Sequence, residues 1–477
     1  MSRPYSKPLD YIVDFVGISS TKSDDKEVIV LHDDSKDIMR WNAINVYEDI
    51  FRNFMTCEIA ILDQDGGFLD RIRTEEMITI KFRTPGKSPR THYFYLYKVN
   101  PIIPLDKIMG AQYVIHGISV EFFANSLRAF SKSYSGKTED MVREIYSEFL
   151  LSKTEKLKKK LYLGNIEDSK TKYDMKFSFP YVNPVEAINH MASVSINEKN
   201  SFACNYIFYE NRDGFWYTCL EEIFKNPDFS TEGAVRRTHT YISSQTLTES
   251  YLDFLKHFNN TIRVEPQNTG DKIVDTIDGV YGEYFSEFDL LYKKYTPYIN
   301  PDKNTTKYLD VKPAEGQRYL DYFDKTAHAE KSIKPLLSKD NEIFHYPLGR
   351  NRVCFTNGAL YSDPVKDPNN SSRITGWKLY DTHEGEYSFL RRSQMQQINL
   401  FTVQITVPGN TDITVGDSVN LNAAIYRSGD GTFIGGKYLV IAVTHKIIPS
   451  GYQSVVTLAR DGVRYREFDT KTEGKAV

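Results

Sequence analysis

Two stretches near opposite ends of the chain share one pattern and decide the fold: YFYLYKVNPIIP at Tyr93–Pro104 and YLVIAVTHKIIP at Tyr438–Pro449. They align without a gap, from the first tyrosine to the shared Ile-Ile-Pro. After each stretch comes a short turn and another strand-like segment, QYVIHGISV from Gln112 and YQSVVTLARDGV from Tyr452. An internal repeat fixes how many related units a chain contains, so it is weighed before other features.

The segments that precede the two stretches also recur in the same order. The first copy has CEIAILDQDGG from Cys57 and then EEMITIKF from Glu75, and the second has FTVQITVPGNT from Phe401 and then GDSVNL from Gly416. Alternation of apolar and polar residues in these segments is typical of strands with one buried face. The sequence therefore predicts two related, small antiparallel β-barrels, so that three chains would supply six similar units to a ring.

Length and charge limit the classes of function. A chain of 477 residues is too long for one core and predicts roughly three to four units of ordinary domain size. The net charge is −3, and basic residues are spread along the chain except for KLKKK at Lys156–Lys160. We interpret that run as a solvated helix end. Stable duplex binding draws on several phosphate contacts, so this balance disfavours a protein that holds DNA but permits one that lets DNA pass.

Membrane insertion and secretion are not predicted. The sequence has no stretch of about 18 apolar residues, and its first residues, MSRPYSKPLDYIV, lack the apolar region of a signal peptide. The four cysteines are scattered and are predicted to be reduced, buried thiols of a protein made in the cytoplasm. They are Cys57, Cys204, Cys219 and Cys354. Cys204 and Cys219 flank a predicted hairpin, so a facing pair there stays an open alternative.

The predicted fold class is mainly β with α+β insertions: two related antiparallel tube-like β-barrels plus an inserted α+β domain. The predicted domains are a first barrel at 1–130, an α+β domain at 131–225, a mixed loop-rich region at 226–385, a second barrel at 386–466 and a charged tail at 467–477. The region at 226–385 is expected to add strands to the second barrel. Two segments have weak signals. INVYEDIFR from Ile44 is interpreted as a short helix or irregular segment, and Asn300–Ser372 as a polar loop.

Two helices and a hairpin define the α+β insertion. In TEDMVREIYSEFLL, Met141, Ile145 and Phe149 recur at helical spacing. A second helix is predicted to begin after Asn183 as N-cap, with Pro184 at its first position. FACNYIFYE and FWYTCL, joined by NRDG, form the pattern of a β-hairpin.

Motifs for catalysis, cofactors and metals are missing or incomplete. GKT at Gly136–Thr138 lacks the first glycine of a phosphate-binding loop, and DQDGG at Asp63–Gly67 lacks the closing glutamate of a calcium loop. His116 and His445 are predicted to occupy equivalent strand regions as core or interface residues, not metal ligands. No catalytic, cofactor or metal site is predicted.

Several ordered motifs resemble one family. FMTCEIAILDQDGGFLDRIRTEEMITIKFRTPG from Phe54 is similar to the central baseplate hub proteins of contractile-tailed bacteriophages, and so is PYVNPVEAINHMASVSI from Pro180. The likeness returns at GDSVNL, at GGKYLVIAVTHKI and at YQSVVTLARDGV, and thus covers most of residues 40–225 and 395–465. Related modules occur in the spike proteins of type VI secretion systems. Residues 300–375 depart from the pattern.

The resemblance implies a homotrimer whose paired barrels form a pseudo-sixfold ring in the virion tail, assembled in the host cytoplasm. Its implied partners are the tail tube protein ring, the central spike protein and surrounding baseplate proteins, with DNA passing through on ejection. On this hypothesis, polar strand positions become candidates for facing the channel or for contacts within the ring. They are Thr402, Gln404, Thr406, Thr79 and Lys81.

Two other functions remain open at this level. A tail-associated peptidoglycan hydrolase would need two carboxylates held across a cleft, and the chain's many acidic residues do not single out such a pair. A receptor- or glycan-binding tail module is suggested by the 33 tyrosines and the long polar segment. Formation of a ring would favour the hub over both.

Overall fold

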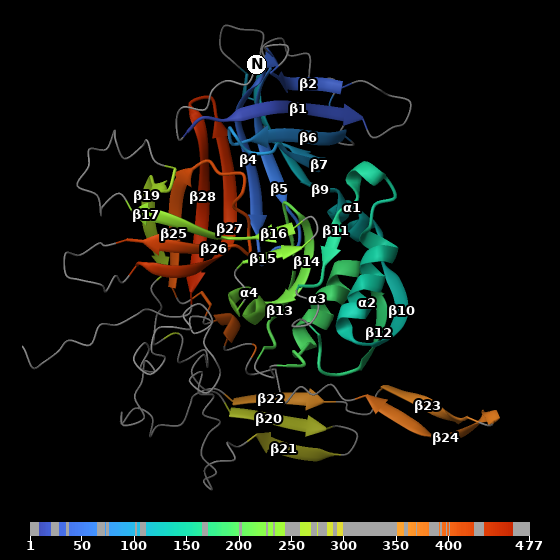
Figure 1. Cartoon of the computed structure of the whole chain (residues 1–477). Helices are drawn as coiled ribbons and strands as arrows, with labels where there is room; N and C mark the ends of the chain where they lie inside the picture. The colour runs from blue at the N-terminus through green and yellow to red at the C-terminus, as the bar shows by residue number, and fades with distance from the viewer. Residues whose placement is uncertain are drawn as a thin grey trace, which may run out of the picture.

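The computed structural model is mainly β, which confirms that part of the predicted fold class (Figure 1). Most strands belong to one 16-stranded sheet, and smaller sheets and helices lie around it. The residues that the structure describes are 9–20, 28–34, 38–63, 72, 76–100, 103–104, 111–164, 170–199, 203–225, 228–231, 234–243, 258–268, 274, 284–289, 293–298, 351–356, 361–368, 370–380, 391, 394–396, 398–399, 401–423 and 434–460.

Two sets of strands within the large sheet pair in the same order, as the sequence repeat predicted. Each set contains four strands in antiparallel pairs. The first set runs β5 (Thr56–Asp63), β9 (Ala111–Ser119), β7 (Arg90–Val99), β6 (Glu76–Arg83), and the second runs β25 (Phe401–Pro408), β28 (Gly451–Arg460), β27 (Gly436–Ile448), β26 (Ser418–Asn422).

The strands that flank the two sets are alike at one end and differ at the other. β4 (Trp41–Asp49) pairs with β5, and β19 (Arg263–Asn268) pairs with β25, both antiparallel. At the other end β1 (Ile12–Ser20) is antiparallel to β6, whereas β17 (Thr238–Ser243) is parallel to β26. Residues 226–385 thus contribute strands to the second set. The pairings among described residues do not close either set into a complete ring, so the barrels remain a proposal.

The strand pairings show that the gapless sequence alignment of β7 with β27 is wrong by one residue. β7 has a bulge between Leu96 and Lys98, and β27 has one between Val440 and Ala442. Leu96 and Val440 are both fully buried, so Leu96 matches Val440, although the gapless alignment had matched it with Ile441. Because side chains alternate along a strand, a slip of one residue would exchange core and surface positions throughout. The shared Ile-Ile-Pro does not mark equivalent positions.

Strand β4 joins the two sets. It pairs with β5 on one side and with the C-terminal half of β27 on the other, from Ala442 opposite Asp49 to Ile447 opposite Ile44. We call this β4–β27 pairing the junction. The prediction of a helix or irregular segment from Ile44 was wrong. Ile44 and Val46 are buried and their neighbours are less so, which is the period of a strand.

Helices and short strands between the two sets share a separate core. The predicted helices are present as α2 (Thr138–Ile145), which continues as a π-turn at Tyr146–Leu150, and α3 (Pro184–Val194). Asn183 is the N-cap residue of α3 but its side chain makes no capping bond, and Asn125 accepts a hydrogen bond from the Val185 N–H at 2.9 Å instead. The other elements are α1 (Val120–Leu127), β10 (Phe130–Gly136), a 3-10 turn (Glu155–Leu157), β11 (Lys160–Tyr162), β12 (Met175–Val182), β13 (Tyr206–Asn211), β14 (Gly214–Cys219) and α4 (Leu220–Lys225).

The predicted hairpin is β13–β14. Its pairing shows that Cys204 and Cys219 do not face each other across it. Cys219 lies opposite Tyr206, whereas Cys204 precedes β13. Both thiols are buried and form no disulfide among the described residues, and the same holds for Cys57. Cys354 lies in a strand whose side chains are outside the described residues.

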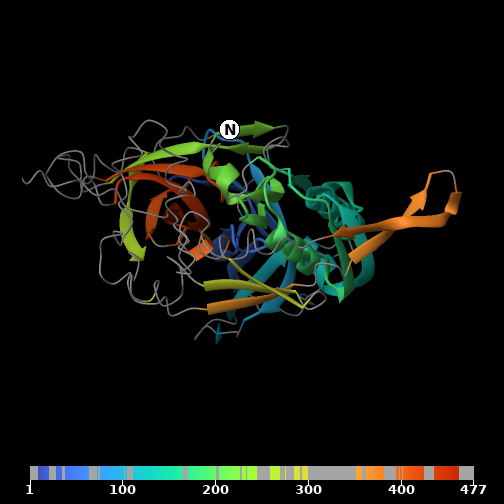
Figure 2. The same ribbon diagram turned by 90° about the horizontal axis from the view of Figure 1, so that it is seen from below.

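Part of the segment predicted to be a loop at Asn300–Ser372 is β-structure. β22 pairs in parallel with β20, and β23 and β24 form a hairpin that extends away from the rest of the chain in both views (Figures 1 and 2). Residues 299–350 lie outside the described residues. The remaining strands are β2 (Val28–Asp33), β3 (Ile38–Met39), β8 (Ile103–Pro104), β15 (Phe229–Thr231), β16 (Ala234–Arg236), β18 (Asn260–Thr261), β20 (Tyr284–Asp289), β21 (Lys294–Tyr298), β22 (Asn351–Thr356), β23 (Tyr361–Asp367) and β24 (Asn370–Tyr380).

A buried charge cluster ties the first strand set to the α+β region. Lys159 Nζ donates to Glu121 Oε2 at 2.7 Å, to Glu210 and to Ser119 Oγ at 2.7 Å. Both carboxylates are almost completely buried, and burial raises the pKa of Glu210. The interpretation of Lys156–Lys160 as a solvated helix end was therefore wrong for Lys159, which forms ion pairs with two internal glutamates.

Replacing Lys159 by methionine should destabilise the chain strongly. The substitution keeps the side-chain length and leaves two buried carboxylates without their cation, which costs about 3–5 kcal/mol. Lys158→Met is the matched control, since the exposed pair of Lys158 with Glu155 contributes less than about 1 kcal/mol. Denaturant unfolding at pH 7 measures both variants, and equal midpoints for the two would contradict the assigned role.

Candidate functional site

The candidate site is one face of a run of eight paired strands. The order is β19, β25, β28, β27, β4, β5, β9 and β7, so the run crosses both strand sets through the junction. One face carries the core side chains, such as Val403 and Ile59. We call the opposite face the open face. The register places on it Thr56, Glu58, His116, Asn45, Tyr47, Thr444, Lys446, Gln453, Thr457, Thr402, Gln404, Thr406, Arg263 and Glu265.

The open face combines these polar residues with apolar ones such as Val114, Ile118 and Val455, and its charges are of both signs. Tyr47 donates its hydroxyl to Glu58 Oε2 at 2.7 Å, and His116 Nδ1 lies 3.3 Å from Glu58 Oε1. Burial and the neighbouring Glu58 raise the pKa of Tyr47, which keeps the phenol protonated as a donor. Gln267 Nε2 donates to Gln404 Oε1 at 3.2 Å. These groups partly satisfy one another, and the face offers no concentrated positive charge to a polyanion.

Three of the five predicted candidates lie on this face and two do not. Thr402, Gln404 and Thr406 follow one another along β25, with Thr402 only 9% exposed. Thr79 and Lys81 lie on β6, outside the eight-strand run.

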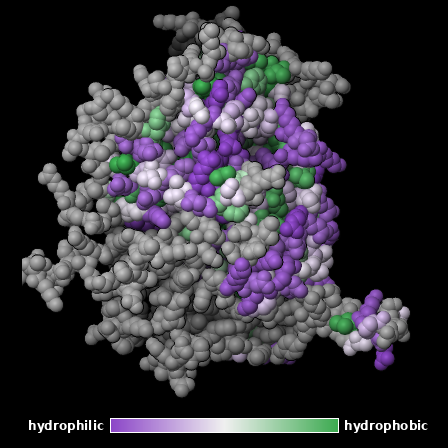
Figure 3. Space-filling view, viewed as in Figure 1, coloured by the Kyte–Doolittle hydropathy of each residue, from purple (hydrophilic) through white to green (hydrophobic). Residues whose placement is uncertain are grey.

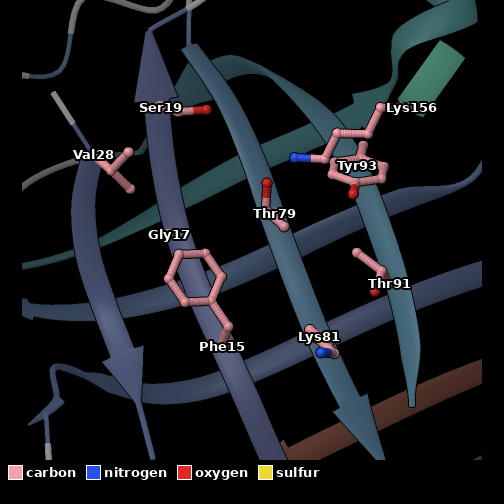
Figure 4. Close-up of a pocket in the computed structure, with 9 residues that line it drawn as sticks. All are labelled: Phe15, Gly17, Ser19, Val28, Thr79, Lys81, Thr91, Tyr93 and Lys156. Carbon is pink, nitrogen blue, oxygen red and sulfur yellow. The ribbon is translucent and has the colours of Figure 1, made fainter. Parts of the chain in front are cut away.

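Thr79 and Lys81 instead line an open groove of about 470 Å³ (Figure 4). Tyr93 and Thr91 of β7 and Phe15 of β1 line it too, and Lys156 lies with its Nζ 5.0 Å from the centre of the Tyr93 ring. The structure therefore does not bring the two predicted groups of residues together.

Several members of the open face were not predicted from the sequence. Tyr47 was missed because its segment was not interpreted as a strand. His116 and His445 were wrongly placed in equivalent strands. His116 is on β9 and belongs to the open face, whereas His445 is on β27 and is buried beneath the junction, with Nδ1 2.7 Å from the Tyr452 hydroxyl.

A buried carboxyl supports the junction from the core side. Glu48 is opposite Val443 and accepts hydrogen bonds from the Thr414 hydroxyl and, at 3.2 Å, from the Val415 N–H. Burial raises the pKa of Glu48 to about 7, and hydrogen bonding from Thr414 opposes that shift only in part. Burial also lowers the pKa of His445 to about 3, so the histidine next to it is neutral.

The described part of the chain contains no candidate metal site. No cluster of three or more His, Cys, Asp or Glu side chains there is placed to hold a metal ion. Within the same residues, no helix is both long enough and apolar enough to cross a bilayer.

Comparisons with known proteins point to phage tails. No family model matches the chain. A probable baseplate hub protein of Vibrio phage KVP40 is 22% identical over 318 residues, a match that spans 63% of this chain and 64% of that protein. A tail protein from Neisseria meningitidis superposes with a TM-score of 0.47 at 11% identity, covering 95% of this chain and 98% of that one.

A type VI secretion component from Escherichia coli superposes with a TM-score of 0.38 at 8% identity, covering 90% of this chain and 74% of that one. The resemblance to baseplate hub proteins stated from the sequence is confirmed. The chain is thus similar to a probable baseplate hub protein, and the match covers less than two thirds of that protein's length.

The raised pKa of Glu48 predicts that the free energy of unfolding depends on pH, and that Glu48→Gln removes this dependence. Because its folded pKa, about 7, lies above the ordinary glutamate value of 4.5, the native state binds more protons between these pH values. Stability from this group is therefore present below pH 4.5 and is lost as pH rises to 7, by about 3 kcal/mol. Glu48→Gln should match the wild type near pH 5 and exceed it near pH 8.

Denaturant unfolding of both proteins across this range measures the difference. Buried His445 and His92 lose stability in the opposite direction, as pH falls through 6.5, but they do so in both proteins and cancel. A constant difference at all pH values would contradict the assignment.

Proposed function

We propose that the chain is a structural baseplate hub that acts without catalysis: three copies form a pseudo-sixfold ring that joins a sixfold tail tube to a threefold central spike. Each chain supplies two tube-like barrels, one built on β4–β9 and one on β17–β28. The ring works in the virion tail, is assembled in the host cytoplasm and contacts surrounding baseplate proteins.

The observation that carries this proposal is the shared register of the two strand sets. They agree in strand order, in the position of a bulge and in which side chains are buried. Two units that are this similar in backbone, but different in sequence, suit a ring with near-sixfold geometry and true threefold symmetry. The related hub of Vibrio phage KVP40 supports the same assignment.

The open face is proposed to line the channel through which DNA passes. Its hydroxyls and amides, together with mixed charges such as Lys446 and Glu58, give phosphates little to bind. Duplex DNA would therefore slide past without being retained. The groove at Thr79 and Lys81 would lie outside that channel.

The mass of the purified chain in solution tests the ring. We expect a trimer of a 55.1 kDa chain, either alone or when the spike protein of the same tail is added. A monomer under both conditions would overturn the proposal, and lysis of purified peptidoglycan by the chain would favour the hydrolase instead.

Positive charge on the open face should slow DNA release. Gln404→Lys with Thr406→Lys adds six cations to the proposed channel of a trimer, and we expect ejection from assembled particles at low salt to slow about tenfold and to recover as salt rises. Thr79→Lys in the groove is the control and should leave the rate unchanged. Equal rates for the two variants would place the channel elsewhere.

A further inference from the structure

Arg236, the last residue of β16, places a positive charge inside the chain. The residue is only 1% exposed, and its Nε, Nη1 and Nη2 atoms have no hydrogen-bond acceptor in the part of the chain that the structure describes. A guanidinium has five N–H donors and stays charged in proteins. A buried charge of this kind destabilises a fold unless an opposite charge and hydrogen bonds compensate it.

Aromatic rings form the walls around the guanidinium. Its central carbon lies 4.7 Å from the centre of the Phe229 ring and 5.4 Å from that of the Trp216 ring. Trp216 is opposite Tyr209 in the β13–β14 hairpin, and both rings belong to the core that also contains Val403 of the second strand set. The ring faces attract the cation, but they do not neutralise it or accept the N–H bonds in its plane.

The acidic groups of this core region have other partners. Burial raises the pKa of Tyr209 and the Arg236 charge opposes that shift, while Asp417, Glu222 and Glu48 act in the same direction as burial. The charges of these groups therefore reach one core region.

Each of the three carboxylates accepts a hydrogen bond from elsewhere. Asp417 accepts from the Arg237 N–H at 3.0 Å, and Glu222 accepts from the Thr218 hydroxyl at 2.9 Å. Glu48 accepts from the Val415 N–H at 3.2 Å. None of them accepts a hydrogen bond from the Arg236 guanidinium.

Arg460 shows how the chain satisfies another buried arginine. It is also 1% exposed, and its central carbon lies 4.8 Å from the centre of the Phe401 ring and 4.4 Å from that of the Tyr438 ring. Its Nη1 donates to the Gly435 carbonyl at 2.8 Å. Arg236 has a similar aromatic environment, but no such acceptor among the described residues.

We propose that Arg236 binds a small monovalent anion, of the size of chloride, inside the chain. The anion would neutralise the guanidinium and accept its N–H bonds. It would hold β16, which leads into β17 of the second strand set, against the β13–β14 hairpin of the α+β region. This site goes beyond the proposed ring and does not depend on it.

Burial decides the size of the ligand. A nucleic acid or a protein segment does not reach a side chain that is 1% exposed. The described part of the face in Figure 3 is mostly hydrophilic, with small apolar areas and no single large patch, so that view does not favour a large apolar partner either. A water molecule accepts N–H bonds but leaves the charge uncompensated, which a monovalent anion does not.

Urea unfolding of the purified chain tests the site, with sodium chloride replacing sodium gluconate at constant ionic strength. Urea is used because guanidinium chloride would itself supply the anion. Above the dissociation constant of chloride, each tenfold rise in its concentration should lower the unfolding equilibrium constant of the wild type about tenfold.

Two variants assign that dependence to one residue. Arg236→Met should lose it. Arg237→Met is the matched control and should keep it, because Arg237 is 44% exposed and pairs with Asp412 at 3.1 Å. General effects of the salt on stability act on all three proteins and cancel in the comparison. An equal chloride dependence for the wild type and Arg236→Met would overturn the inference.

Crystals of the wild-type chain grown in sodium bromide give a readout that needs no variant to fold. Bromide replaces chloride in such a site and is located by its anomalous scattering. We expect an anomalous peak in contact with the Arg236 guanidinium, and bromide at surface positions only would overturn the inference. Neither measurement requires a trimer, so a chain that stays monomeric would overturn the proposed ring and not this site.

Discussion

The pairing of β4 with β27 is the constraint on which the rest of the structure depends. Six successive residue pairs make one continuous sheet from two copies that lie far apart in the sequence. The pairing also covers apolar side chains of both copies, and Glu48 and His445 lie beneath it with defined partners. The sets also meet at Thr84, whose hydroxyl donates to the Gly409 carbonyl at 3.1 Å, but the β4–β27 pairing is what makes their sheets continuous.

Within a chain the junction forms without the loss of translational freedom that association between chains requires. The proposed ring of three chains would have to overcome that loss at each contact between chains.

The sequence predicted the architecture better than it predicted the contacts. Strand order, the helices at Thr138 and Pro184 and the β13–β14 hairpin follow from local periodicity and turn residues, and these were confirmed. The one-residue offset between β7 and β27 was not visible, because both registers keep similar letters aligned and only burial distinguishes them. β4 was misjudged because Glu48, a charged residue, occupies a buried position of the strand.

Long-range electrostatics were also beyond the sequence. Lys159 stands in a run of lysines, and only the fold brings Glu121 and Glu210 to it from elements distant in the chain. Of the predicted candidate residues, Thr402, Gln404 and Thr406 share a face because they share a strand. Thr79 and Lys81 have the same alternation, but the strand order places β6 outside the eight-strand run.

An electron cryo-microscopy map of the assembled protein tests the central claim most directly. We predict a threefold ring with a central hole, in which each chain contributes two lobes of superposable strand order joined through β4 and β27. A map in which only one lobe per chain borders the hole, or in which β4 and β27 lie apart, would contradict the account.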